Sequence, residues 1–182
     1  MAWSVPLTAV SNTALTAAQW NASVRDNLLT TFPALATTAG QLAVATGANA
    51  IAARVCPSDV VSTAEAVVAT SYGNISGGTV GPTVTVTTGA FCFVVLACNM
   101  FNSTGGAASY MSYAISGATT QAAGDSTALY YESSNAGDLI AMGITIPNSI
   151  TGGSNTFQAK YKVGAGNGTF GSRRLAVLNF GQ

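Results

Sequence analysis

Carboxylates are the first candidates for acid–base chemistry in this chain, because it contains no histidine. Three of the six acidic residues, Asp125, Glu132 and Asp138, follow one another in one part of the sequence. A glycosidase needs two carboxyl groups about 5 to 9.5 Å apart, and no spacing here forces such a pair. We interpret the three residues as solvated turn acids. The alternative is an enzyme that acts on cell-wall polymer through a carboxylate pair among them.

The missing histidine also removes whole classes of site. Imidazole is the general base of the common nucleophile triads and the most frequent zinc ligand. Residues 164–168 (GAGNG) superficially resemble part of a phosphate-binding loop. Such a loop leads from a strand into a helix, whereas here a β pattern lies on both sides and predicts a hairpin turn. We therefore expect a protein that is not an enzyme and that has no cofactor and no metal.

Cysteine chemistry is not expected either. Cys92 and Cys98 lie in one extended run, roughly 20 Å apart by strand rise, which is too far for a disulfide. Cys56, before Pro57, could in principle meet either of them. The start of the chain lacks the basic and apolar stretches of a secretory signal, so we expect folding in a cytoplasm and three reduced thiols.

Two groups of polar residues stand out in the second half of the chain. Arg173 and Arg174 interrupt an apolar strand, so alternation turns one of them inward, where a guanidinium needs partners. We expect a pair with Glu132 or Asp138, or bonds to backbone carbonyls across a subunit boundary. Four tyrosines could form a sugar-stacking surface with the Asn and Ser loops, although core and interface use of tyrosine is commoner. They are Tyr110, Tyr113, Tyr130 and Tyr131.

Charge is unusually scarce in the sequence. Lys and Arg number six, Asp and Glu number six, and charged residues make up 7% of the chain, against about a quarter in an ordinary soluble domain. A neutral surface of Thr, Ser, Asn and Gly repels its neighbours weakly, which favours assembly. No basic footprint for nucleic acid or anionic membrane is present. The longest apolar run, residues 90–98, is about half of the roughly 20 residues of a membrane helix and predicts a buried strand without membrane insertion.

The elements that must position these residues fall into two parts. Residues 1–58 read as an N-terminal anchor segment with a helix over about 17–30 and a short hairpin over about 41–53. Thr16 and Gln19 form a capping box, and Leu15 and Trp20 form a staple across it. Trp20, Val24 and Leu28 then share one face. This helix face packs either against the β part of the same chain or against other copies and a docking partner, and the sequence leaves both interpretations open.

Residues 59–182 read as an all-β body. Eight strands separated by Gly, Asn and Ser turns predict a sandwich or jelly roll. In residues 157–163 apolar and polar positions alternate, whereas residues 90–98 are apolar on both faces. Since no helices cover such a strand here, we expect it to be buried against another copy of the chain. The expected strands span residues 64–69, 83–88, 90–99, 109–115, 128–132, 138–146, 155–163 and 170–178.

The opening of the chain resembles a known group of proteins. Trp3, Pro6 and residues 15–21 and 24–28 (LTAAQWN and VRDNL) are similar to the N-termini of tailed-bacteriophage structural proteins, particularly minor tail, fibre or head-decoration proteins of actinobacterial phages. Residues 40–54 are similar to a connector behind that opening. Residues 171–178 look like the ending of trimeric phage knobs, which resemble the jelly rolls of tumour necrosis factor and the complement heads.

This resemblance implies a homotrimer on the surface of a phage virion, assembled in the host cytoplasm. The N-terminal segment would dock on a capsid or tail protein, and Arg173 and Arg174 would make trimer or buried polar contacts. We expect a capsid decoration or short head spike; the alternative is a minor tail or tail-tip protein that binds host cell-surface glycan. The expected docking residues are Trp3, Pro6, Leu15, Trp20, Val24 and Leu28.

Overall fold

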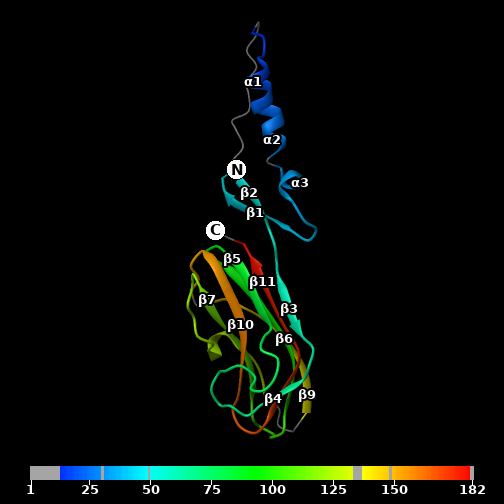
Figure 1. Ribbon diagram of the computed structural model, residues 1–182, viewed down its shortest axis with the longest axis vertical. Coiled ribbons are helices and arrows are strands. Elements are labelled where there is room, and N and C mark those ends of the chain that lie inside the picture. Colours follow the sequence, from blue (N-terminus) through cyan, green and yellow to red (C-terminus); the bar gives the residue numbers. More distant parts are fainter. Residues whose placement is uncertain (1–12, 30, 49, 133–136, 148, 181–182) are drawn as a thin grey trace. The chain divides into compact units, whose positions relative to one another are not determined.

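The structure is a computed structural model that describes residues 13–29, 31–48, 50–132, 137–147 and 149–180. Its contacts divide the chain into two compact units, one ending at Cys56 and the other running from Pro57 to Phe180. The sequence pattern places this boundary slightly later, after residue 58. Figure 1 labels the elements of both units.

A capped helical run opens the described part of the first unit. It consists of α1 (Ala17–Trp20), a π-helical segment (Asn21–Arg25) and α2 (Asp26–Leu28). The expected capping box is present: the Gln19 N–H donates to Thr16 Oγ1 at 3.2 Å, and the Thr16 N–H donates to Gln19 Oε1 at 2.9 Å. These reciprocal bonds satisfy two backbone donors of the first turn, which explains why the helix begins where the sequence predicts.

A short helix and a hairpin complete the first unit. The helix α3 (Phe32–Leu35) is not predicted by the sequence analysis. It contains a proline, which is tolerated there because the first turn of a helix has no use for that N–H. The strands β1 (Leu42–Gly47) and β2 (Ala50–Arg54) pair antiparallel, close to the predicted hairpin.

The second unit consists of two antiparallel sheets packed face to face (Figure 1). The four-stranded sheet has the order β5-β10-β7-β8, and the five-stranded sheet has the order β3-β11-β6-β9 with β4 also paired to β11. From β5 onward the chain crosses repeatedly from one sheet to the other, as in a jelly roll. The predicted all-β jelly-roll sandwich is thereby confirmed. The strands are β3 (Ser58–Val61), β4 (Glu65–Val67), β5 (Thr83–Thr88), β6 (Cys92–Asn102), β7 (Ser109–Gly117), β8 (Leu129–Tyr131), β9 (Gly137–Thr145), β10 (Gly153–Val163) and β11 (Gly168–Asn179).

The core lies between the two sheets and takes one side of each strand. On β10 the predicted inward positions Phe157, Ala159, Tyr161 and Val163 are all at most 1% exposed. Strand β6 contributes every second residue from Cys92 to Met100. Strand β3 was not predicted, because its four residues begin with Ser and Asp, which have low β propensity. The strand forms by pairing with β11.

All three cysteines are free thiols. Burial raises the pKa of Cys92 to about 11 and that of Cys98 to about 12. Both thiols are therefore protonated at neutral pH and act as small hydrophobic core residues.

Candidate functional site

The three acidic residues that could form a catalytic pair have different surroundings. Asp125 is exposed and accepts hydrogen bonds from Lys162 Nζ at 2.7 Å and from the Tyr72 hydroxyl at 2.8 Å. These bonds, the one from Lys162 above all, lower the pKa of Asp125, so it stays ionised and is unsuited to act as a general acid. Glu132 borders a surface cavity after β8, and the Asp138 side chain lies outside those described.

The described residues were also compared with a metal site, a phosphate loop and a membrane helix. No group of three His, Cys, Asp or Glu side chains there is arranged to hold a metal ion. Residues 164–167 join β10 to β11, but these strands belong to different sheets, so the connection crosses the sandwich and the predicted hairpin turn is wrong. The Gly164 N–H donates to Ala108 O at 2.8 Å. Among the described helices, none has the length and apolar character required to cross a membrane.

Arg173 is the arginine that faces inward. A register shift between Gly171 and Arg174 on β11 places Arg173 in the interior with 0% exposure and leaves Arg174 exposed. Arg173 Nη2 pairs with the carboxylate of Glu65 and donates to Thr63 O at 3.3 Å, while Nη1 donates to Thr79 O at 3.3 Å. The guanidinium thus holds the segment around β4 onto the sheet.

The partners of Arg173 differ from those that the sequence suggested. They are Glu65 and two carbonyls of the same chain, in place of Glu132, Asp138 or a subunit boundary. Glu65 lies 108 residues away in sequence, so spacing gives no signal for this pair. The Arg173 guanidinium also lies 5.5 Å from the centre of the Tyr161 ring, which completes its buried surroundings.

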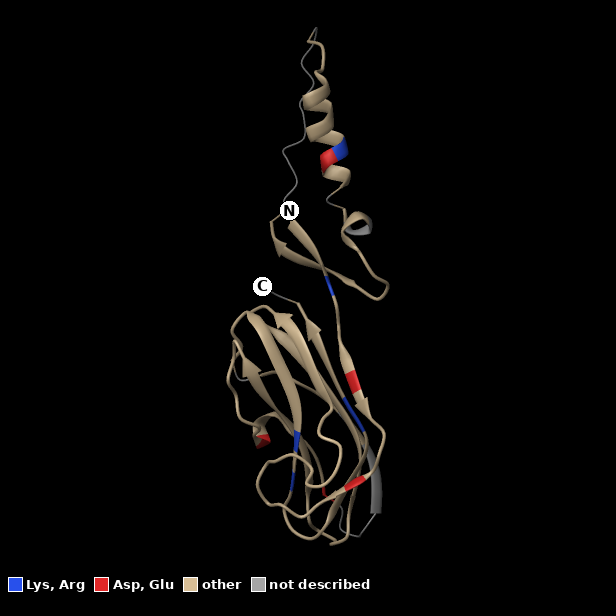
Figure 2. Ribbon diagram, viewed as in Figure 1, with Lys and Arg blue, Asp and Glu red and all other residues tan. Residues whose placement is uncertain are grey.

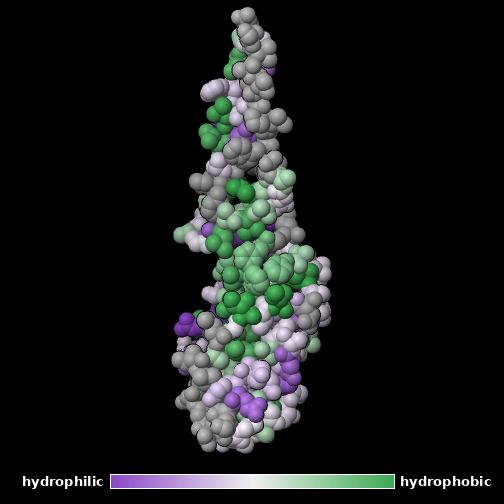
Figure 3. Space-filling view, turned by 180° about the vertical axis from the view of Figure 1, so that it is seen from behind, coloured by the Kyte–Doolittle hydropathy of each residue, from purple (hydrophilic) through white to green (hydrophobic). Residues whose placement is uncertain are grey.

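The outer face of the five-stranded sheet is apolar. Its side chains point away from the core on neighbouring strands: Val95 of β6 is opposite Ala176 of β11 and Ile144 of β9, and Phe93 is opposite Leu178. Figure 3 shows apolar residues gathered on the back of this unit. We call this surface the apolar face; it consists of Val60, Phe91, Phe93, Val95, Ala97, Ile144, Ile146, Ala176, Leu178 and Phe180.

Several side chains of the apolar face are open to solvent. Ile144 is 67% exposed, Ile146 51% and Phe91 43%. Phe93 packs edge-on against both Phe91 and Phe180, with ring centres 5.0 and 5.5 Å apart. A contiguous surface of aromatic and β-branched residues is the usual mark of a protein interface and is a liability on a monomer.

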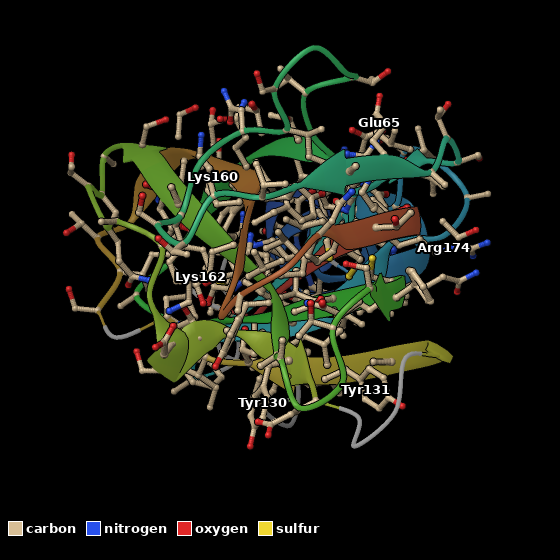
Figure 4. The ribbon with its side chains drawn as sticks, turned by 90° about the horizontal axis from the view of Figure 1, so that it is seen from below. Glu65, Tyr130, Tyr131, Lys160, Lys162 and Arg174 are labelled. Atoms are coloured by element: carbon tan, nitrogen blue, oxygen red, sulfur yellow. The ribbon has the colours of Figure 1, made fainter. Side chains whose placement is uncertain are left out.

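The outer face of the four-stranded sheet has the opposite character. Thr85 and Thr156 share a hydrogen bond of 2.8 Å, and Lys160 is bonded to Asn74 and Gln158. Figure 4 shows Lys160 and Lys162 on one side of the sandwich and Arg174 on the other. Figure 2 shows how few charged residues the chain carries altogether. The four-stranded sheet therefore presents a face suited to solvent.

Tyrosines do line part of this polar face. Tyr110 of β7 is opposite Tyr130 of β8, and their rings stack with centres 5.6 Å apart. Lys162 Nζ lies 4.5 Å from the centre of the Tyr110 ring and 4.8 Å from that of Tyr72. We call Tyr72, Tyr110 and Tyr130 the tyrosine row. Lys162 lies against two of its rings, and the Asp125 carboxylate neutralises the charge of Lys162.

Two of the four tyrosines proposed for a sugar surface lie elsewhere. Tyr113 is 0% exposed in the core, and Tyr131 packs against the core cluster. Both belong to the inward-facing side of their strands. Burial, with smaller effects from its neighbours, raises the pKa of Tyr113 to about 12. Tyr72 was not among the predicted tyrosines, because it lies in a loop distant from the other rings in sequence.

A cavity of about 340 Å³ lies beside the tyrosine row. It is an open surface cavity bordered by the loop between β6 and β7, the turn between β10 and β11, and the end of β8. Its lining residues are Thr104, Gly105, Gly106, Ala107, Ala108, Tyr110, Glu132, Gly164 and Ala165. It brings together one aromatic ring, one carboxylate and three stretches of backbone.

In the first unit, three predicted docking residues are open to solvent. Leu15 is 50% exposed, Trp20 56% and Leu28 60%, while Val24 is half-buried. The neighbouring Leu29 is also 58% exposed, which the predicted stripe did not include. The two remaining docking residues, Trp3 and Pro6, lie outside the described residues.

Comparisons with known proteins add little to this geometry. No protein-family model matches the chain, and no curated protein matches it. One similar solved structure is that of infectious bursal disease virus Gx strain, with a TM-score of 0.40 and 13% sequence identity. The match covers 76% of this chain and 38% of that one, so this chain spans well under half of its length.

Proposed function

We propose that this protein is a non-enzymatic structural protein of a phage virion, a homotrimeric surface appendage docked through its N-terminal segment. The single observation that carries the proposal is the apolar face of the five-stranded sheet. Fully burying one large apolar side chain stabilises an assembly by about 1.5 to 3 kcal/mol, and this face offers several. Association of identical jelly rolls through it removes the exposed patch.

Resemblances in the sequence support the trimeric state and the location on a phage virion. Residues 171–178 resemble the ending of trimeric phage knobs, and residues 15–28 resemble the openings of virion proteins. The exposed Leu15, Trp20 and Leu28 fit a segment that binds another protein. A capsid decoration or short head spike is the form that we favour, located on the particle surface after assembly in the host cytoplasm.

Two experiments test this proposal. Sedimentation velocity of the full chain at micromolar concentration should give a trimer, and a strict monomer would contradict it. Electron microscopy of phage particles labelled with an antibody to this chain should place it on the head. Label on the tail tip alone would favour the minor tail alternative, and unlabelled particles would remove the virion role.

A second candidate, a tail protein that binds host glycan, is favoured by the tyrosine row. Tyr110 and Tyr130 present ring faces on the polar side of the sandwich, next to a cavity. Such a role is compatible with a trimer, because the tyrosine row and the apolar face lie on different sheets. The two candidates are separated by the labelled-particle images.

A further inference from the structure

The cavity beside the tyrosine row has features of a ligand site. At about 340 Å³ it lies at the lower end of the range of about 300 to 1,000 Å³ found for small-molecule sites. That space suits one or two sugar-sized rings. Its walls are formed by three separate loops, so it is built by the fold and not by one segment.

One wall of the cavity is a preorganised aromatic surface. Tyr110 is stacked with Tyr130 at an angle of 26° between the rings, and Lys162 lies against the Tyr110 ring. Lys162 is itself held by Asp125 at 2.7 Å. A ring fixed in this way loses little conformational entropy when a ligand packs on it. Tyr130 remains 61% exposed and extends the aromatic surface outward.

The other walls are polar. Glu132 supplies two carboxylate oxygens that accept hydrogen bonds, and Thr104 supplies a hydroxyl. The loop backbone at Gly105 and Gly106 is open, and Gly106 has a φ of 74°, so a side chain there would be strained. The cavity therefore offers a flat apolar surface on one side and hydrogen-bonding groups on the other.

The charges of the lining restrict the ligand class. Among the lining residues that the structure describes, Glu132 is the one that carries a charge, and none is cationic. The Lys162 charge beside the Tyr110 ring is already paired with Asp125, so a phosphate or a carboxylate ligand would meet the negative charge of Glu132 without a free cation among the described lining residues. The described lining also contains no large aliphatic side chain, which disfavours a lipid chain. A neutral sugar has both apolar ring faces and hydroxyl donors, and it matches the two kinds of wall.

We propose that the second unit binds a neutral carbohydrate in this cavity, with a sugar ring on Tyr110 and Tyr130 and a hydroxyl donating to Glu132. This inference rests on the second candidate function and narrows it to a neutral sugar held by named groups of this cavity. The cavity also lies at the end of the sandwich away from Pro57, where the chain enters this unit. The Val177 N–H donates a hydrogen bond to Pro57 O, and β11 runs about 30 Å from Val177 to its first residue, Gly168, at the cavity end.

The test uses the full chain and an array of oligosaccharides. The neutral spots carry glucose, galactose, mannose, rhamnose and N-acetylhexosamines, and the same slide carries phosphorylated and carboxylated oligosaccharides and choline. We expect binding to neutral spots. Binding to none of them, or only to anionic spots or choline, would overturn the proposal.

Variants then locate the site by calorimetry with the neutral oligosaccharide that binds best. Loss of the ring in Tyr130→Ala should weaken binding about two- to tenfold, while Tyr130→Phe keeps it. Glu132→Gln removes a charged acceptor and should weaken binding about tenfold or more. Thr87→Ala, an exposed strand residue on β5, is the matched control. Equal affinity in all four variants would contradict the site.

A further variant separates this inference from the proposed trimer. Ile144 lies on the apolar face and not in the cavity. If Ile144→Ala dissociates the assembly and keeps sugar binding, both ideas stand independently. Sugar binding by a protein that is always monomeric would support the cavity and contradict the trimer. A stable trimer that binds no neutral sugar would support the trimer and contradict the sugar site in the cavity.

Discussion

Ile144→Ala is the sharpest probe of the apolar face. Ile144 is 67% exposed in the single chain, so about two-thirds of its surface is available for burial between copies. Full burial of an isoleucine is worth about 1.5 to 3 kcal/mol, which leaves about 1 to 2 kcal/mol per copy. A trimer contains this residue three times, so the substitution should cost it about 3 to 6 kcal/mol. That corresponds to about two to four orders of magnitude in the association constant.

Sedimentation equilibrium over a dilution series measures this constant. Circular dichroism of the dissociated variant should match that of the parent chain, because an exposed side chain contributes little to the fold of one copy. Thermal unfolding should occur at a lower temperature than in the parent, because the variant loses the stabilisation that association provides. Thr87→Ala is the matched control: it also replaces an exposed β-branched strand residue, but it lies on the polar face of the four-stranded sheet. It should leave the association constant unchanged.

An interface through the apolar face is contradicted if Ile144→Ala and Thr87→Ala have the same effect on the association constant. An association constant that is unchanged in Ile144→Ala would mean that the apolar face does not lie between the copies. Equal weakening by Thr87→Ala would mean that a general loss of strand propensity, and not burial, is responsible. A parent chain that sediments as a monomer throughout the series would refute the interface altogether.

The remaining predictions concern single contacts. Glu65→Ala leaves the buried guanidinium of Arg173 without its counter-charge and should lower the free energy of unfolding by about 3 to 5 kcal/mol in chemical denaturation; unchanged stability would refute the structural role of the pair. The pKa of Asp125 is depressed, so its ion pair is present above the ordinary value of 3.8 and is lost as the pH falls through the lower folded value. A carboxyl NMR titration should show this midpoint below 3.8 and a rise in Lys162→Met; an unmoved midpoint would contradict the bond. Trp20→Ala should reduce attachment to particles in a co-sedimentation assay, and full attachment would remove Trp20 from the anchor.

The parts of the fold that local patterns determine were predictable. The capping box at Thr16 depends on residues three apart, and the alternation along β10 is visible in seven consecutive residues. The doubly apolar run that becomes β6 correctly signalled a strand with a second apolar side, because one side of it faces the core and the other carries Phe93 and Val95. In each case the cause lies within one element.

Features that depend on distant residues were not predictable. The bulge between Gly171 and Arg174 decides which arginine is buried, and it is set by the pairing of β11 with β6. The partner of Arg173 is Glu65, the first residue of β4, which is far away in sequence. The same limit applies to Tyr113, whose position on the inward side of β7 depends on where pairing with β10 begins.

The scarcity of charge acquires a physical meaning in the second unit. Arg173 with Glu65, and Lys162 with Asp125, are used to fix loops and rings and contribute little net charge to the surface. Among the described side chains, Arg174 is the charged residue beside the apolar face, on the strand next to edge strand β3. Because association through such a face does not depend on ion pairs, it should be insensitive to screening by salt, whereas a charged interface weakens within a Debye length. With these two pairs engaged inside the unit, the outer side of the five-stranded sheet is left for the proposed association, and that of the four-stranded sheet, with Tyr110 and Tyr130, faces solvent.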